Sequence, residues 1–369
     1  HPDHAIFFFA LAVAIGLGPY CHLWAREGQD LCIYYAGYTG ICRMLYSSAG
    51  QPLERFRMEN LTNRLKMTNV DALDEKSDIK WYREMLPGLE GKLLLTGVHQ
   101  ANRGGNAFCG GLLYFDTAKP DAIYKLSEMS RCYNTNCMDW RIVRDAAGAA
   151  VQEIYVGGDY NEQYALQLAP ERRPPAGGPK LFAYQDGPDG VTDRYALLLA
   201  PAAAKEITHL DHRFAQDQVH LLLVLSAAEG VYLASLDLDA GRFADLVRLP
   251  FGIAAFIHPT RYLLPAPDGR LLAYLYDDAQ RSSATFCEVS VAPDGRLALS
   301  PSLTLTSKTA EALAPSVVAF VPDAARRDGS YDLMIGGSSA WNRLETSVRV
   351  IEDFIGPRTG PPAATEAKP

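Results

Sequence analysis

A short phrase recurs along this chain. It consists of an apolar run, one or two glycines, a polar turn that carries an aromatic residue, and a second apolar run. It is clearest at Glu153–Leu168 (EIYVGGDYNEQYALQL) and returns at Tyr331–Val350 (YDLMIGGSSAWNRLETSVRV), with weaker copies that begin at Leu31 and Lys92. Short apolar runs bounded by glycine-rich polar turns are typical of β-hairpins, so we expect a chain built from one repeated hairpin.

Seven segments fit this pattern, at intervals of roughly 30 to 60 residues, a period typical of propeller blades. They are Leu31–Ser48, Lys92–Phe115, Glu153–Leu168, Lys180–Ala200, Val219–Asp237, Arg270–Val291 and Tyr331–Val350. A single small sheet cannot bury both of its faces, whereas sheets packed in a ring can. The sequence therefore predicts an all-β fold, a β-propeller with seven blades, within a range of six to eight. The alternative is a pair of β-sandwich domains separated at the Pro/Gly-rich stretch Pro170–Pro179.

Weaker runs complete the expected blades. Phe243–Leu249 and Leu297–Leu305 are expected to be flanking strands, and Trp140–Val143 an outer strand of the unit that begins at Lys92. The charged stretch Gln51–Pro87 is expected to be a polar connection with one short helix. The predicted domain organisation is a leader or anchor at 1–20, a propeller at 30–355 and a disordered tail at 356–369, which is rich in Pro, Gly, Ala and Thr.

The N-terminal segment Ala5–Gly18 is apolar and uncharged over 14 residues. A membrane-spanning helix needs roughly 20 apolar residues, and the apolar region of a signal peptide has about 7 to 15. We expect a signal peptide or membrane anchor, and therefore a protein that is secreted, periplasmic or attached to the extracytoplasmic side of a membrane. The alternative is a buried first strand or helix.

The chain has seven cysteines: Cys21, Cys32, Cys42, Cys109, Cys132, Cys137 and Cys287. In an exported protein some of them are expected to form disulfides. Cys132 and Cys137 flank the turn-rich YNTN and suit a small disulfide loop, and Cys32 and Cys42 lie on the two arms of one hairpin. Buried free cysteines are the alternative. No CxxC motif indicates zinc.

The formal net charge of −8 argues against a nucleic-acid backbone as the main partner, because no Lys/Arg run offsets it. We therefore expect a protein or glycan ligand, with the N-terminal apolar segment as a point of membrane attachment.

Two segments carry a resemblance to a known family. YYAGYTGICRMLYSSAG and IGGSSAWNRLETSVRV resemble the blade hairpins of five-bladed glycoside hydrolases, over these two short stretches only. Such enzymes need paired carboxylates, and the resemblance implies a catalytic base at Asp30, just before the first strand of the first hairpin. Turn acids at Asp159, Glu162 and Glu345 are the further candidates. Acids at turns also occur because they bind turn backbone N–H groups.

Ligand-binding candidates lie at the hairpin tips. The polar tip after Lys92–Thr96 offers His99, Asn102 and Arg103, and its glycines permit close approach of a ligand. Tyr160 and Trp341 occupy equivalent turn positions and could form an aromatic rim. No GxxxxGK[ST] or GxSxG motif accompanies them.

The histidines at His209–His212 form the only His cluster within the expected fold. In a regular strand, residues i and i+2 share a face, so His209 and Asp211 could face one ion while His212 points away. We interpret the stretch as a solvated connection, and we predict no metal and no cofactor.

Regular repeats without an evident catalytic motif favour a binding or interaction module for a protein or glycan. The alternative is a carbohydrate-active hydrolase with carboxylates in the central channel, so the sequence leaves enzyme activity uncertain.

Overall fold

A computed structural model of the 369-residue chain describes residues 21–27, 30–37, 40–47, 57–60, 79–88, 92–100, 108–116, 133–160, 166, 169–173, 180–187, 190–198, 207–249, 262–276, 283–306, 317–322, 330–338 and 346–356. These residues form β-strands, turns and one 3-10 helix, Pro170–Arg172, with no α-helix among them. The all-β prediction is confirmed. No helix in these ranges is long and apolar enough to cross a membrane. The expected leader at 1–20 and most of the tail at 356–369 lie outside the described residues.

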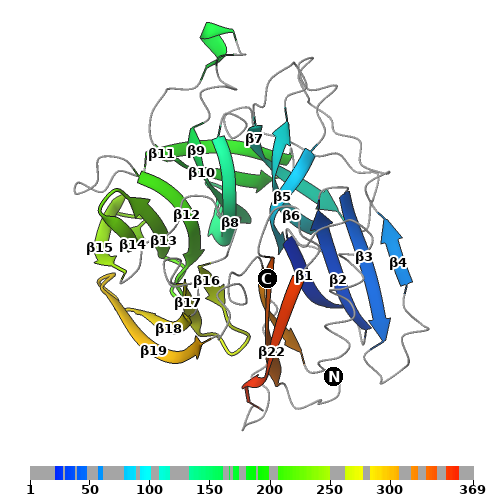
Figure 1. Cartoon of the computed structure of the whole chain (residues 1–369). Helices are drawn as coiled ribbons and strands as arrows, with labels where there is room; N and C mark the ends of the chain where they lie inside the picture. Colours follow the sequence, from blue (N-terminus) through cyan, green and yellow to red (C-terminus); the bar gives the residue numbers. More distant parts are fainter. Residues whose placement is uncertain are drawn as a thin grey trace.

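The described strands form six antiparallel sheets of consecutive strands (Figure 1). The first sheet contains β1 (Cys21–Glu27), β2 (Asp30–Gly37), β3 (Gly40–Ser47) and β4 (Arg57–Asn60). The second contains β5 (Ile79–Pro87), β6 (Lys92–Gln100) and β7 (Phe108–Asp116). The third contains β8 (Tyr133–Arg144), β9 (Ala150–Tyr160), β10 (Lys180–Gly187) and β11 (Gly190–Leu198).

The C-terminal half continues the same plan. The fourth sheet contains β12 (Ile207–Phe214), β13 (His220–Ala227), β14 (Gly230–Asp237) and β15 (Arg242–Arg248). The fifth contains β16 (Leu263–Pro265), β17 (Leu271–Tyr276), β18 (Ser283–Val291) and β19 (Leu297–Thr306). The sixth contains β20 (Val317–Pro322), β21 (Tyr331–Ser338) and β22 (Thr346–Ile355).

The sheets are arranged around a common centre, as Figure 1 shows. The first strands of successive sheets contact one another in order: β1 with β5, β5 with β8, β8 with β12, and β12 with β16. First strands on the inside and later strands further out are the arrangement of a β-propeller. The propeller prediction is thus confirmed. The six described sheets fall within the predicted range of six to eight blades, and seven blades stays a prediction.

Strand β13 shows why the sheets pack in this way. Its sequence HLLLVLSA is apolar without alternation, which is typical of a strand buried on both faces. Leu221, Leu223 and Leu225 pack toward the third sheet, with Tyr155 and Leu181. The side chains between them, Leu222 and Val224, pack toward the fifth sheet with Leu263, Leu271 and Ala273. Each buried leucine contributes about 1.5–3 kcal/mol, so the hydrophobic core is a series of layers between neighbouring blades.

The pairing of β9 corrects the interpretation of the clearest repeat. β9 pairs with β8 and with β10, where Val156 is opposite Phe182. The prediction that the second half of Glu153–Leu168 is a strand paired with β9 is therefore wrong. Leu166, in that second half, lies in a turn with 59% of its surface exposed. Because β9 and β10 pair with each other across the segment Pro170–Pro179, this segment does not separate two domains. The two-sandwich alternative is wrong.

Two further expectations are corrected. Trp140–Val143 belongs to β8, the first strand of the third sheet, and is not an outer strand of the preceding unit. The stretch Gln51–Pro87 contains strands β4 and β5, and β5 pairs with β6 through two register shifts. Trp81 and Tyr82 supply the β propensity that the charged neighbours concealed. The flanking strands expected at Phe243–Leu249 and Leu297–Leu305 are present as β15 and β19.

Tight turns of one kind connect several strands. In Ala266–Arg270 and Ala292–Arg296 the first residue's N–H donates to the last residue's carbonyl at 2.7 and 2.8 Å. The glycine in each turn has a positive φ, 91° for Gly269 and 84° for Gly295, and Gly148 has 82° in a similar turn. A side chain is disfavoured in this left-handed region by about 1–2 kcal/mol.

We expect Gly295→Ala to destabilise the protein more than Gly148→Ala. Both substitutions carry the backbone cost of about 1–2 kcal/mol. A Cβ on Gly295 would also lie 2.4 Å from the Cβ of Ala244, whereas one on Gly148 would have no neighbour within 4 Å. Overpacking of this kind adds about 1–3 kcal/mol. Urea unfolding of both variants checks the prediction, and equal losses of stability would contradict it.

Candidate metal centre

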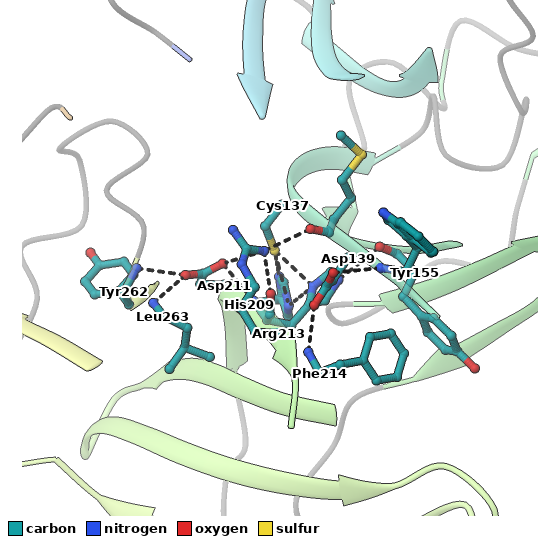
Figure 2. A network of polar contacts seen from close by, with 12 residues as sticks. Cys137, Asp139, Tyr155, His209, Asp211, Arg213, Phe214, Tyr262 and Leu263 are labelled. Atoms are coloured by element: carbon teal, nitrogen blue, oxygen red, sulfur yellow. Dashed lines mark hydrogen bonds and ion pairs between the residues drawn. The ribbon is translucent and has the colours of Figure 1, made fainter. Parts of the chain in front are cut away.

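Three potential metal ligands converge between the third and fourth sheets. They are Cys137 on β8 and His209 and His212 on β12. Figure 2 shows Cys137 and His209 side by side. The Cys137 Sγ lies 3.0 Å from Nδ1 of His212 and 3.8 Å from Nε2 of His209, and those two nitrogens are 3.3 Å apart. The three residues have 3%, 0% and 0% of their surfaces exposed. The cluster is thus enclosed by the inner strands of two blades.

A β-bulge brings the two histidines to the same face of β12. His209 is opposite Leu225 and Asp211 is opposite Val224, so Leu210 is the extra residue. One extra residue reverses the alternation of side chains, and positions i and i+3 then share a face. The prediction that His209 and Asp211 face one ion while His212 points away is therefore wrong. The prediction that this stretch is a solvated connection is wrong as well, because β12 is a buried strand.

The third sheet supplies the third ligand, Cys137, and also the space for the His209 ring. β8 has a register shift between Thr135 and Cys137, and Cys137 is paired with Gly157 of β9. A Cβ on Gly157 would lie 2.1 Å from Cε1 of His209. Gly157 belongs to the GG pair of the clearest sequence repeat. It leaves room for the imidazole ring of the next blade.

Burial keeps both histidines neutral at physiological pH. Desolvation, with the nearby positive charge of Arg213, lowers the pKa of His209 to about 3. Desolvation, His209 and Arg213 also lower the pKa of His212 well below its usual value, against a hydrogen bond to the Tyr155 carbonyl that raises it. Neutral imidazole is the form that binds metals.

The hydrogen bond to Tyr155 also orients the His212 ring. Nε2 of His212 lies 3.0 Å from the Tyr155 carbonyl oxygen, so this nitrogen carries the proton and donates it. The lone pair of Nδ1 therefore points toward Cys137 and His209. A metal-binding histidine typically donates its second ring N–H to a carbonyl or carboxylate in this way.

The spacing of the three atoms suits a transition-metal ion. Zinc bound at about 2.0 Å to nitrogen and about 2.3 Å to sulfur separates tetrahedral ligands by roughly 3.3–3.6 Å. The observed separations of 3.0, 3.3 and 3.8 Å bracket these values. Thiolate with imidazole is a donor set for zinc and copper, and not for calcium or magnesium.

The carboxylates beside the cluster are bound to backbone N–H groups. Asp211 accepts hydrogen bonds from Tyr262 and Leu263 of the next blade at 2.7 and 2.8 Å. Asp139 on β8 accepts one from Phe214 of β12 at 2.8 Å. These acids therefore join neighbouring blades, as the left and right sides of Figure 2 show.

A repeat between first strands, distinct from the hairpin repeat, marks the site in the sequence. The segments CMDWR (Cys137–Arg141) and HLDHR (His209–Arg213) carry Asp and Arg at the same positions, 72 residues apart in the chain. They occupy equivalent places on β8 and β12, the first strands of consecutive sheets. Aligning these first strands, instead of the hairpins, would have placed Cys137 and His209 at equivalent positions.

The residues predicted from the sequence lie elsewhere. Asp30 begins β2 in the first sheet, Asp159 and Tyr160 end β9 opposite Asn134 and Tyr133, and His99 is in β6 opposite Cys109. The other candidates, Asn102, Arg103, Glu162, Trp341 and Glu345, lie outside the described residues. Asp30 and Asp159 are on different sheets.

The disulfide predictions are affected in two ways. Cys137 forms no disulfide, so its predicted bond to Cys132 is wrong. The register sets Cys32 opposite Leu45 and Cys42 opposite Tyr35, so these two cysteines do not face each other across the hairpin. Cys287 is also free and buried.

Fold and strand order define this chain as a β-propeller protein. No protein-family profile and no curated protein sequence matches it. Among solved structures it is similar to a candidate 6-phosphogluconolactonase from Bacteroides fragilis, with a TM-score of 0.46 and 14% identity over 89% of this chain and 79% of that one. It is also similar to a periplasmic gluconolactonase from Pseudomonas aeruginosa (TM-score 0.40, 9% identity, 76% and 68% covered). A third is an endo-arabinase from Bacteroides thetaiotaomicron (0.36, 10%, 78% and 93%).

Packing of Gly157 against His209 predicts a coupled pair of substitutions. We expect Gly157→Ala to destabilise the metal-free protein by about 1–3 kcal/mol, because the new methyl group overlaps the imidazole ring. In the His209→Ala background the ring is absent, and the same change is expected to cost much less. Chemical denaturation of the four proteins checks this coupling, and an equal cost in both backgrounds would contradict it.

Proposed function

We propose that this protein is a metal-binding β-propeller in which Cys137, His209 and His212 hold one transition-metal ion between two neighbouring blades. The observation that carries the proposal is the convergence of one sulfur and two nitrogens within 3.8 Å of one another in a fully enclosed place. Two bulges and a glycine are needed to produce it.

Hydrogen bonding alone accounts less well for this cluster. With its Nε2 proton donated to Tyr155, His212 offers a single lone pair at Nδ1. Both the Cys137 thiol and Nε2 of His209 approach that lone pair, at 3.0 and 3.3 Å. One lone pair cannot accept two strong hydrogen bonds, so in a purely hydrogen-bonded cluster His209 would donate to the Cys137 sulfur across 3.8 Å, whereas a metal ion accepts electrons from all three atoms at once. This geometry favours a ligand set over ordinary core packing.

An ion at this place would stabilise the fold. Its ligands come from β8 and β12, whose contact is part of the ring of inner strands. A ligand that binds only the folded state stabilises it by about 4 kcal/mol when its concentration is a thousand times its Kd. The function supported by the geometry is therefore metal binding that fastens two blades together.

Metal content tests the proposal directly. We expect the purified chain to bind one equivalent of zinc or copper, measured by mass spectrometry of the metals, and its Tm to rise on loading. Cys137→Ser and His212→Asn are expected to lose that equivalent, because each removes a ligand atom.

Cys287→Ser is the matched control, since Cys287 is equally buried, in a hydrophobic layer away from the cluster. It should keep the bound metal. Absence of bound metal in the wild-type chain, or an equal loss in Cys287→Ser and Cys137→Ser, would overturn the proposal.

A hydrolase is the second candidate function, and one observation favours it. Within the described residues the cluster supplies three ligands, and catalytic zinc sites use three protein ligands with water in the fourth position. Cys137, His209 and His212 would hold such an ion, which would activate water for hydrolysis. An acid pair on β8 and β12 is not available for this role, because Asp139 and Asp211 bind backbone N–H groups.

A hydrolysis screen separates the two candidates. A panel of chromogenic glycosides and esters is incubated with the metal-loaded chain and with Cys137→Ser. For a hydrolase we expect turnover that is lost in Cys137→Ser, since the metal is lost with the thiolate. Metal-loaded protein without turnover leaves binding as the function, and turnover that persists in Cys137→Ser excludes the cluster as its site.

A further inference from the structure

The β-bulge of β12 lies between the two histidine ligands, and an aspartate lies within it. We propose that Asp211 is the positioning residue of the metal centre, and that it fixes the bulge by binding the first strand of the fifth sheet. His209 and His212 then face Cys137 together. This inference rests on the proposal that the cluster binds a metal, and it adds a coupling between that metal and a second contact between blades.

The bulge sends neighbouring side chains of β12 in two directions. Leu210, the extra residue, packs in the hydrophobic layer toward the fifth sheet. Asp211 is directed to the same sheet, because its Oδ2 accepts two successive backbone N–H groups there, at 2.7 and 2.8 Å. The residues on either side of this pair, His209 and His212, meet Cys137 of the third sheet. The direction of the aspartate and that of the ligands are therefore set by one bulge.

The carboxylate of Asp211 binds backbone groups through both of its oxygens. Its Oδ1 accepts the N–H of His212 at 2.9 Å, and its Oδ2 accepts those of Tyr262 and Leu263. Figure 2 shows the bonds to Tyr262 and Leu263 on one side of Asp211 and the ligands on the other. The backbone of the ligand His212 is thus tied through Asp211 to the fifth sheet.

Arg213 extends this connection to the third sheet. Its Nη1 lies 3.6 Å from Oδ1 of Asp211 and donates to the carbonyl oxygens of His212 and Met138 at 2.6 and 2.9 Å. Met138 follows the third ligand, Cys137, on β8. The backbones of both ligand-bearing strands are therefore joined through Asp211 and Arg213, directly beside the cluster.

A second aspartate of the fourth sheet makes the same set of bonds away from the ligands. The pairing of β14 with β15 passes from Phe243 to Asp245, so Ala244 is the extra residue of another bulge. Oδ1 of Asp245 accepts the N–H of Leu246 at 2.8 Å, and Oδ2 accepts that of Leu297 in the fifth sheet, also at 2.8 Å. An aspartate that follows a bulge and binds the next blade is therefore a feature of the blade contact, and β12 adds ligands on either side of it.

This arrangement couples the centre to the next contact between blades. An ion bound to His209 and His212 holds the bulge from one side, and the N–H groups of Tyr262 and Leu263 hold it from the other. Each interaction favours the same conformation of β12, so each strengthens the other, and by thermodynamic linkage the effect is reciprocal. Metal bound between the third and fourth sheets is thus expected to stabilise the contact between the fourth and fifth.

Hydrogen exchange on the full chain tests the coupling. Exchange is followed by mass spectrometry with and without one equivalent of Zn²⁺, in peptides that contain residues 262–264 and 297–299. We expect Zn²⁺ to slow exchange of the Tyr262 and Leu263 N–H groups by about fivefold or more, and that of Leu297 much less. Leu297 is the matched site, because its N–H binds an aspartate across the same two sheets. Equal slowing at both places would indicate a general gain in stability and would overturn the inference.

Asp211→Asn tests the coupling from the other side. The amide nitrogen accepts no hydrogen bond, so the variant loses one of the two acceptors that hold the bulge. The affinity for Zn²⁺, measured by competition with a chromophoric chelator, is expected to fall by about 5- to 150-fold, although all three ligand atoms remain. Asp245→Asn is the matched control and should keep the wild-type affinity. An equal affinity in Asp211→Asn and Asp245→Asn would contradict the positioning role.

The outcomes separate this inference from the proposal on which it rests. A wild-type chain that binds neither Zn²⁺ nor copper(I) overturns metal binding, and the inference with it. A chain that binds only copper(I) is tested in the same way with that ion, without oxygen. Metal binding that slows exchange equally at both places overturns the positioning role alone. If Asp211→Asn does not fold, the exchange comparison on the wild-type chain still decides.

Discussion

Aspartates bind backbone N–H groups across two neighbouring pairs of blades, the third with the fourth and the fourth with the fifth. Asp139 binds the backbone N–H of Phe214, Asp211 binds those of Tyr262 and Leu263, and Asp245 binds that of Leu297. A backbone N–H that is buried without a partner costs about 1–3 kcal/mol, so the carboxylates are suited to fix how neighbouring strands meet. Apolar layers on either side of a sheet attract neighbouring blades without fixing their relative position. The hydrogen bonds from the aspartates are directional and fix that position. The candidate centre depends on the same contacts, because Asp211 lies between its two histidines in the chain.

The centre shows how a small irregularity turns a core strand into a ligand-bearing one. Without the extra residue Leu210, His212 would face the fifth sheet and His209 alone would face Cys137. With it, Asp211 turns toward the next blade and both imidazoles turn toward the third sheet. The same bulge therefore accounts for a structural bond and for the ligand pair. Gly157 completes the arrangement by leaving space for the His209 ring.

Parts of the fold followed from the sequence for clear physical reasons. The hairpins at Lys180–Ala200 and Val219–Asp237 were predicted because their apolar runs and turns are contiguous, so both partners are visible locally. The prediction of a hairpin at Glu153–Leu168 failed because β9 pairs with β10, which follows a long connection. The composition of that connection is typical of a domain linker. The second arm of that predicted hairpin, YALQL, alternates apolar and polar residues as a strand does. Pairing is decided by the neighbouring strand that is available, and a single sequence does not show which one that is.

The sequence by itself determined that this chain is all-β and repetitive, and that both faces of its sheets must be buried against other sheets. Runs such as HLLLVLSA are too apolar to face water on either side, so they require layers on both sides. Only the tertiary structure decided that Cys137, His209 and His212 meet. The first lies 72 residues before the second in the chain, and the face that a side chain occupies depends on bulges with no local signature. Hydrophobicity is a property of each residue and can be taken directly from the sequence. The convergence of three side chains depends on the register of strands from two blades.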